Sequence, residues 1–89
     1  MTIEYSSRFV KDLKALKGTP SFAKIKELAF DLIPIVETLD EIPHFTKLEG
    51  YDHYYRIRIG DYRIGFKMED STLVFMRALY RKEIYRYFP

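Results

Sequence analysis

The 89-residue sequence contains no cysteine, and this absence excludes disulfides, thiolate nucleophiles and cysteine-ligated zinc sites. It contains no tryptophan, and its four glycines and four prolines are too few for a low-complexity or linker segment. Long apolar runs are also missing, since none approaches the roughly 20 residues of a membrane-spanning helix. The N-terminus MTIEYSSRF lacks the basic and then apolar pattern of a signal peptide. These absences predict one ordered, soluble, cytoplasmic domain over residues 1–89.

Aromatic residues and, in the second half of the chain, arginines are abundant. Aromatics make up 17% of the sequence, as eight Tyr and seven Phe. Residues 1–49 carry seven basic and eight acidic side chains, whereas residues 50–89 carry eight and five. Of the seven arginines, only Arg8 lies before residue 50. Because the planar guanidinium suits a phosphate group, this segregation favours a nucleic-acid ligand, with chance clustering of ordinary surface residues as the alternative.

The first half of the sequence predicts a strand followed by two helices. Thr2–Tyr5 alternates polar and apolar residues, and Ser6 or Ser7 caps a helix that ends at Gly18. This helix places Phe9, Val10, Leu13 and Leu16 on one face, and Lys11, Asp12, Lys14 and Lys17 toward water. A second helix runs from Ser21 to about Ile33, where Pro34 removes a backbone donor and should break or kink it.

The second half predicts β-structure. Residues 41–53 have no clear period and form a connection, in which His44 and His53 are expected to be surface residues. Strands are expected at 54–59, 62–69 and 72–79, followed by a short helix or extension at 81–88 packed by Ile84, Tyr85 and Phe88. The fold class is therefore α+β: an N-terminal strand, a two-helix hairpin, a three-stranded antiparallel meander and a short C-terminal helix, with the helices on one face of a small sheet.

The stretch YYRIRIGDYRIGF predicts a hairpin whose two faces differ sharply. A two-residue Gly60-Asp61 turn pairs Ile59 with Tyr62, Arg58 with Arg63, Ile57 with Ile64, and Arg56 with Gly65. One face is then apolar, and the other presents Arg56, Arg58, Arg63, Gly65 and Lys67. Like charges placed opposite each other cost some tenths of a kcal/mol up to about 1.

A phosphate ligand would explain this repulsion. Gly65 is expected to open a shallow concavity among three guanidiniums, where a phosphodiester can bind. The alternative is that Glu49, Glu69 or Glu83 folds over and pairs these arginines. Arg77, on the next strand, either joins the basic face or lies at the exposed end of its strand.

The run YRIRIGDYRIGF, the apolar strand after it and the segment YRKEIY resemble the RelE/ParE superfamily of toxin–antitoxin toxins. The helix FVKDLKAL and the lead-in LEGYDHYYRIR extend the likeness over nearly the whole chain, which looks closest to the RelE-type mRNA interferases. The resemblance implies a ribosome-dependent endoribonuclease that cleaves mRNA by attack of a ribose 2′-OH on the phosphate, without metal or cofactor. It also implies two partners, a RelB-like antitoxin and the ribosome with bound mRNA.

The same resemblance assigns roles to individual residues. Catalysis would rest on Arg56, Arg58, Arg63, Arg81 and Tyr85, and substrate binding on Lys67, Arg77 and Tyr80. Many relatives have His just before the terminal arginine, where this sequence has Tyr80. Proton transfer then shifts to Tyr80 or Tyr85, because arginine does not release its proton at neutral pH. Two alternatives keep the fold: a ParE-like inhibitor of DNA gyrase, or a catalytically silent protein that only binds antitoxin or RNA.

Overall fold

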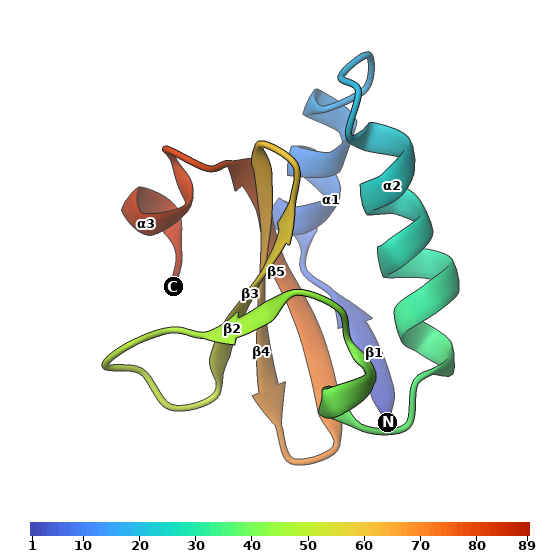
Figure 1. The fold of residues 1–89 in the computed structure, drawn as a ribbon, viewed down its shortest axis with the longest axis vertical. Coiled ribbons are helices and arrows are strands. Elements are labelled where there is room, and N and C mark those ends of the chain that lie inside the picture. Colours follow the sequence, from blue (N-terminus) through green and yellow to red (C-terminus); the bar gives the residue numbers. More distant parts are fainter.

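A computed structural model describes all 89 residues and contains one five-stranded sheet with helices packed against it (Figure 1). The sheet has the order β1-β5-β4-β3-β2, in which only the β1–β5 pairing is parallel. The strands are β1 (Thr2–Tyr5), β2 (Phe45–Lys47), β3 (Tyr54–Ile59), β4 (Tyr62–Glu69) and β5 (Thr72–Tyr80). The α+β class and the antiparallel β3–β4–β5 meander are confirmed, and the meander holds the arginines in a fixed register.

The two predicted helices pack side by side against one face of the sheet (Figure 1). Helix α1 (Ser7–Ala15) begins at Ser6, whose Oγ accepts a hydrogen bond from the amide of Phe9. Helix α2 (Phe22–Glu27) continues as a π-helical turn, η1 (Leu28–Leu32), and a 3₁₀ turn, η2 (Ile33–Ile35). The change of helix type comes just before Pro34, which cannot donate the next backbone hydrogen bond. Pro34 itself lies inside the 3₁₀ turn, and the chain becomes extended only at Val36. The helical segment therefore changes type before Pro34 and ends just after it, and its α-helical part is shorter than the predicted one.

Two features of the sheet were not predicted. A 3₁₀ turn, η3 (Leu39–Glu41), leads into residues 41–53. These residues contain the strand β2, which pairs with β3 through only three residues. Three residues are too few for a periodic pattern, so the sequence did not reveal this edge strand. A register shift between Gly65 and Phe66 also interrupts the β4–β5 ladder. The β3–β4 register, by contrast, is the predicted one at every pair.

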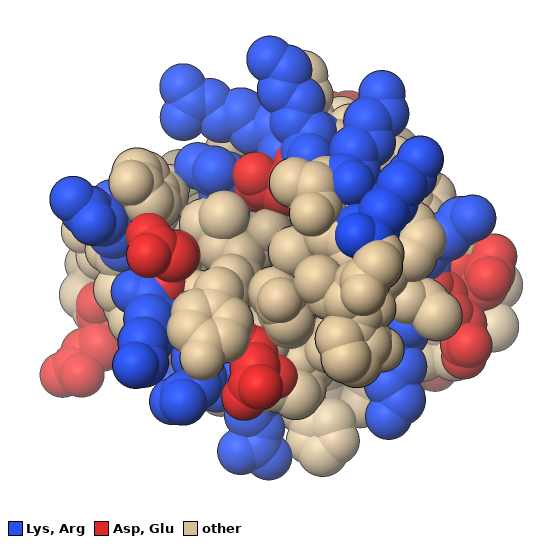
Figure 2. All heavy atoms as spheres, turned by 90° about the horizontal axis from the view of Figure 1, so that it is seen from above, with Lys and Arg blue, Asp and Glu red and all other residues tan.

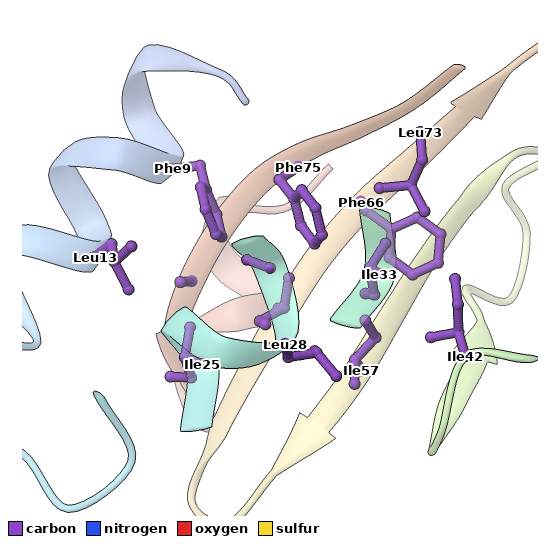
Figure 3. Close-up of a cluster of buried hydrophobic side chains, with 13 residues drawn as sticks. Phe9, Leu13, Ile25, Leu28, Ile33, Ile42, Ile57, Phe66, Leu73 and Phe75 are labelled. Atoms are coloured by element: carbon purple, nitrogen blue, oxygen red, sulfur yellow. The ribbon is translucent and has the colours of Figure 1, made fainter. Parts of the chain in front are cut away.

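The main core lies between the helices and the apolar face of the sheet (Figure 3). Phe9 of α1 stacks on Phe75 of β5 with 5.1 Å between the ring centroids. Ile25 and Ile33 are fully buried from the α2 side, opposite Ile57, Ile64 and Phe66 of the hairpin. Burial of Ile57, Ile64 and Phe66 fixes the register of the hairpin, because a slip by one residue would turn the side chains of the shifted strand to the other face of the sheet.

The short C-terminal helix, α3 (Ile84–Tyr87), lies on the opposite face of the sheet from α1 and α2 (Figure 1). The prediction that all helices share one face is therefore wrong. Ile84 and Phe88 are buried there with Leu48, in an apolar cluster separate from the main core. This small cluster exists because Ile84 and Phe88, four residues apart, fall on one side of the turn and face the sheet. Tyr85 points away from it and is 64% exposed, so its predicted packing role is also wrong.

Candidate functional site

The side chains of four arginines and one tyrosine gather on the face of the sheet that carries α3. We call these residues the arginine cluster: Arg56 and Arg58 of β3, Arg63 of β4, Arg81 after β5, and Tyr85 of α3. Arg58 lies opposite Arg63, and Arg56 lies opposite Gly65. Burial and then the positive charges of Arg56 and Arg58 lower the pKa of Arg63, with smaller effects from Tyr85 and Arg81. All five residues therefore share one electrostatic neighbourhood.

The three hairpin arginines have no carboxylate partner. No Asp or Glu oxygen lies within 4.0 Å of Arg56, Arg58 or Arg63. Arg63 instead donates from Nη1 to the carbonyl oxygens of Gly60 and Tyr62, each at 2.9 Å. The alternative in which Glu49, Glu69 or Glu83 neutralises this face is wrong. The face keeps its positive charge and can accept an anion.

Tyr85 and Arg81 reach the cluster from the C-terminal segment. The guanidinium carbon of Arg56 lies 5.5 Å from the centroid of the Tyr85 ring, a cation–π contact. The amide of Arg81 donates to the carbonyl oxygen of Asp61 at 2.8 Å, which fixes the start of this segment to the hairpin turn. The side chain of Arg81 lies 3.6 Å from the Asp61 carboxylate in an exposed pair. Such an exposed pair is weak, so Arg81 is free to turn to a ligand.

Tyr80 is placed at the edge of the cluster. Its ring lies 5.8 Å from the guanidinium carbon of Arg81 and packs edge-on against Tyr62 of β4, with 5.7 Å between the ring centroids. The Tyr80 side chain is 37% exposed. Tyr80 therefore contacts the cluster through Arg81, whereas Tyr85 contacts it through Arg56.

Gly65 does not open a concavity for a ligand. A Cβ atom added there would lie 2.7 Å from carbon atoms of the Phe88 ring, so the ring already occupies the space above the glycine. The prediction failed because the chain folds its own C-terminus back onto this face, where burial of Phe88 against Leu48 and Ile84 removes apolar surface from water. Gly65 is needed for this close approach. A ligand would therefore have to bind at the guanidinium groups beside Gly65 and not above the glycine itself.

Lys67 and Arg77, two of the residues assigned to substrate binding, are engaged elsewhere. Lys67 pairs with Glu69 at 2.6 Å. Arg77 donates from Nε and Nη2 to both oxygens of Asp12, at 2.7 and 3.1 Å. Neither interaction involves the arginine cluster. The prediction that Asp12 faces water is wrong as well, because its Oδ2 also accepts the amide of Ala78, where β1 no longer pairs with β5.

Seen from the end that carries the hairpin turn, lysine and arginine side chains line much of the molecular edge, with carboxylates interspersed (Figure 2). Beside Arg56 and Tyr85 lies a groove of about 440 Å³ whose other wall is the segment 46–51. Another groove, of about 330 Å³, lies between α2 and the end of β3 and includes only Arg58 of the cluster. One signal for the first groove is visible in the sequence, an aromatic residue, Tyr51, directly after the loop glycine Gly50.

The remaining predictions about the chemistry of the surface concern histidine, metals and membranes. His44 and His53 are exposed loop residues, as predicted. No three His, Cys, Asp or Glu side chains come together in a way that could hold a metal ion. No helix is long and apolar enough to cross a bilayer.

Comparison with known proteins places this geometry in a family. Residues 3–85 match the model of the ParE toxin of type II toxin-antitoxin systems, parDE. The chain belongs to this toxin family. Within it the chain is of the RelE type: it is 39% identical to Toxin RelE3 of Methanocaldococcus jannaschii over 90 residues, covering the full length of both.

Solved structures of related toxins have the same fold. The toxin in the RelB-RelE antitoxin-toxin complex from Methanococcus jannaschii superposes with a TM-score of 0.77 and 38% identity, over 97% of this chain and 99% of that one. A chain of the Escherichia coli DinJ-YafQ complex superposes with a TM-score of 0.69 and 27% identity, over 98% and 97% of the two chains. The predicted RelE-like fold is therefore confirmed.

Proposed function

We propose that this RelE-type toxin is a ribosome-dependent endoribonuclease that cleaves mRNA without a metal ion. The observation that carries the proposal is the arginine cluster, in which three guanidiniums lie together with no carboxylate within 4.0 Å. A fold selected only for stability would neutralise such a group. A phosphodiester supplies the missing negative charge and accepts directional, charge-assisted hydrogen bonds from arginine.

In the proposed reaction the 2′-oxygen of a ribose attacks the adjacent phosphorus atom and the bond from phosphorus to the 5′-oxygen breaks. The products are a 2′,3′-cyclic phosphate and a 5′-hydroxyl. Negative charge grows on the non-bridging oxygens in the transition state, and Arg56, Arg58 and Arg63 are held where they can stabilise it. Arg81 reaches the same phosphate from the other side of the hairpin turn.

One proton must leave the 2′-hydroxyl, with solvent water as its acceptor, and one must reach the 5′-oxygen. Arginine stays protonated at neutral pH, so it serves as an electrostatic clamp. Tyr85 is the candidate for the proton transfer to the leaving oxygen, or for stacking on a base, because its side chain is 64% exposed beside Arg56. Tyr80 is the second candidate, through its contact with Arg81.

The proposal includes a RelB-like antitoxin as partner and a cytoplasmic site of action. Two of the similar solved toxins are in complexes with antitoxins, RelB and DinJ. A partner of this kind would neutralise the toxin by covering the arginine cluster or displacing α3 from it. The mRNA would be the other ligand, held in the ribosome.

Primer-extension mapping of mRNA in a ribosome-programmed translation mixture tests the function. The wild-type protein should cut within the ribosomal A site, and Arg81→Ala and Tyr85→Phe should each reduce the cutting. Absence of A-site cuts by the wild-type protein, together with inhibition of gyrase supercoiling, would overturn the nuclease proposal. That outcome would favour a second candidate, a ParE-like inhibitor of DNA gyrase, which is compatible with the match of residues 3–85 to the ParE toxin family.

A further inference from the structure

The groove next to the arginine cluster is lined partly by apolar and aromatic side chains, whereas the cluster consists mainly of arginines. Its walls are the segment 46–51, Arg56 of β3, Tyr85 of α3, and Phe88 with Pro89 at the C-terminus. At about 440 Å³ it falls within the range of roughly 300–1,000 Å³ typical of small-molecule sites. Because Arg56 and Tyr85 line both the groove and the cluster, a ligand in the groove would adjoin a phosphate bound at the cluster.

Tyr51 gives the groove an exposed aromatic surface that is held in place. Its side chain is 50% exposed. Its ring packs edge-on against Tyr54, at 6.1 Å between centroids, and Tyr54 packs edge-on against the buried Phe88, at 5.8 Å. The amide of Tyr51 also donates to the carbonyl oxygen of Leu48 at 3.3 Å. A tyrosine fixed in this way loses little entropy when a nucleobase stacks on it.

Glu49 gives the groove an acceptor that is not used within the chain. Its carboxylate lies among the lining residues, is exposed, and takes part in no salt bridge. A neighbouring lysine of the groove, Lys47, is already paired with Asp52 at 3.5 Å. A carboxylate can accept hydrogen bonds only, so it binds the exocyclic amino group of cytosine or adenine and is repelled by the two carbonyl oxygens of uracil.

We propose that this groove binds the nucleobase next to the phosphate held by the arginine cluster, with Tyr51 as the stacking surface and Glu49 as the group that favours a base with an exocyclic amino group over uracil. The inference rests on the proposed function, because it takes single-stranded RNA as the ligand. To that function the inference adds a base-binding site in the β2–β3 loop, and the preference of this site for certain bases would determine which nucleotide lies next to the bound phosphate.

The test is a titration of the isotope-labelled protein, followed by NMR, with three trinucleotides that carry 2′-O-methyl riboses and so cannot be cut: CCC, AAA and UUU. The amide signals of Glu49 and Tyr51 should shift and saturate, with CCC and AAA binding at least about threefold more tightly than UUU. Tyr51→Ala should weaken CCC and AAA binding by about tenfold, since stacking of one base contributes about 1–3 kcal/mol. Tyr51→Phe should preserve this binding, because the ring remains.

Glu49→Gln should bring UUU within about twofold of CCC, because the amide can both donate and accept. Two matched controls should leave the preference unchanged. Asp70→Asn removes the same charge at the β4–β5 turn, where Asp70 is exposed, and Tyr87→Ala removes an equally exposed tyrosine that does not line the groove. Shifts confined to the arginine cluster, equal affinity for the three trinucleotides, or equal losses in the Tyr51 and Tyr87 variants would each overturn the inference.

The titration also separates this inference from the proposed function, because the trinucleotides are bound and not cut. Discrimination in the groove without A-site cleavage in the translation mixture would overturn the nuclease proposal alone. Cleavage without shifts at Glu49 and Tyr51 would overturn the base-binding site alone.

Discussion

On β5, Arg77 donates to both oxygens of Asp12, whereas on the β3–β4 hairpin Arg58 lies opposite Arg63 and neither has a carboxylate within 4.0 Å. Both regions belong to one sheet, and Arg77 stands opposite Gly65 in the same register. The side chains of Arg77 and Asp12 are only 15% and 13% exposed, so their pair is part of the packed structure. Arg58 is exposed.

The difference shows that the chain has the means to neutralise an arginine and does not do so at the hairpin. The sequence carries 13 acidic residues. One of them, Asp61, lies in the hairpin turn itself, yet its carboxylate is nearest to Arg81, at 3.6 Å, and is 71% exposed. A largely buried carboxylate thus separates Arg77, which is part of the packed structure, from the hairpin arginines that we propose to bind a phosphate. Four experiments sharpen this distinction.

The largest expected effect is on cleavage by the Arg58→Ala variant. Removing a guanidinium that stabilises charge in the transition state should lower the single-turnover cleavage rate by about 10²- to 10³-fold. The measurement uses mRNA in a programmed ribosome with the toxin in excess. Arg8→Ala, which removes an exposed arginine outside the cluster, is the control and should change the rate by less than about threefold. A similar small change for Arg58→Ala would remove this residue from the proposed site.

The next largest effect is expected on stability, and it concerns the buried pair of Arg77 and Asp12. Asp12→Ala should lower the free energy of unfolding by about 2–4 kcal/mol, because Arg77 and the amide of Ala78 lose their acceptor in a largely buried place. Urea denaturation measures it. Asp52→Ala breaks an exposed pair and should cost less than about 1 kcal/mol. If Asp12→Ala abolishes cleavage by protein that is still folded, Arg77 has a role in the site as well as in the fold.

A smaller loss of stability is expected from Gly65→Ala, which tests how α3 is seated beside the cluster. The added methyl group would lie 2.7 Å from the Phe88 ring, and overpacking of this kind costs about 1–3 kcal/mol. A double-mutant cycle with Phe88→Ala, followed by urea denaturation, isolates the contact. The Gly65→Ala penalty should disappear when Phe88 is already gone. A penalty that persists would mean that the strand itself, and not Phe88, requires glycine.

Local pattern was sufficient to predict most of the fold. The alternation of Ile57, Ile59, Tyr62 and Ile64 with arginines determines the hairpin register, because only one register buries the apolar set. The end of the helical segment near Pro34 follows in the same way from a missing backbone donor. The parts of the fold that were not predicted depend on contacts between segments far apart in the sequence. Strand β2 is defined only by its pairing with β3, and the place of α3 only by the packing of Phe88 against Leu48 and over Gly65.

For the site, the sequence predicted which residues gather but not which arginines are free. Arg56, Arg58, Arg63, Arg81 and Tyr85 do share one neighbourhood. Arg77 belongs to the same arginine-rich half of the sequence as the cluster. In the fold, however, α1 brings Asp12, which is 65 positions away in the chain, into contact with it. No spacing rule relates the two residues, since the contact depends on how α1 crosses the edge of β5 after β1 ends. The groove beside Arg56 and Tyr85 is equally a product of tertiary structure, since the C-terminal residues that line it lie more than 30 positions after the segment 46–51.

The smallest effect should be a gain in stability, and it concerns the same residue as the largest. Arg58→Thr replaces one of two like charges that face each other across the hairpin, so the free energy of unfolding should rise by some tenths of a kcal/mol, up to about 1. Thr also suits a strand better than a charged residue at an exposed position. The repulsive part of the gain should shrink in 1 M salt, where the Debye length is about 3 Å, while the propensity part should remain. Urea denaturation at low and high salt separates the two parts. A variant that is less stable at both salt concentrations would mean that the arginines stabilise the free protein, and the contrast with Arg77 would then fail.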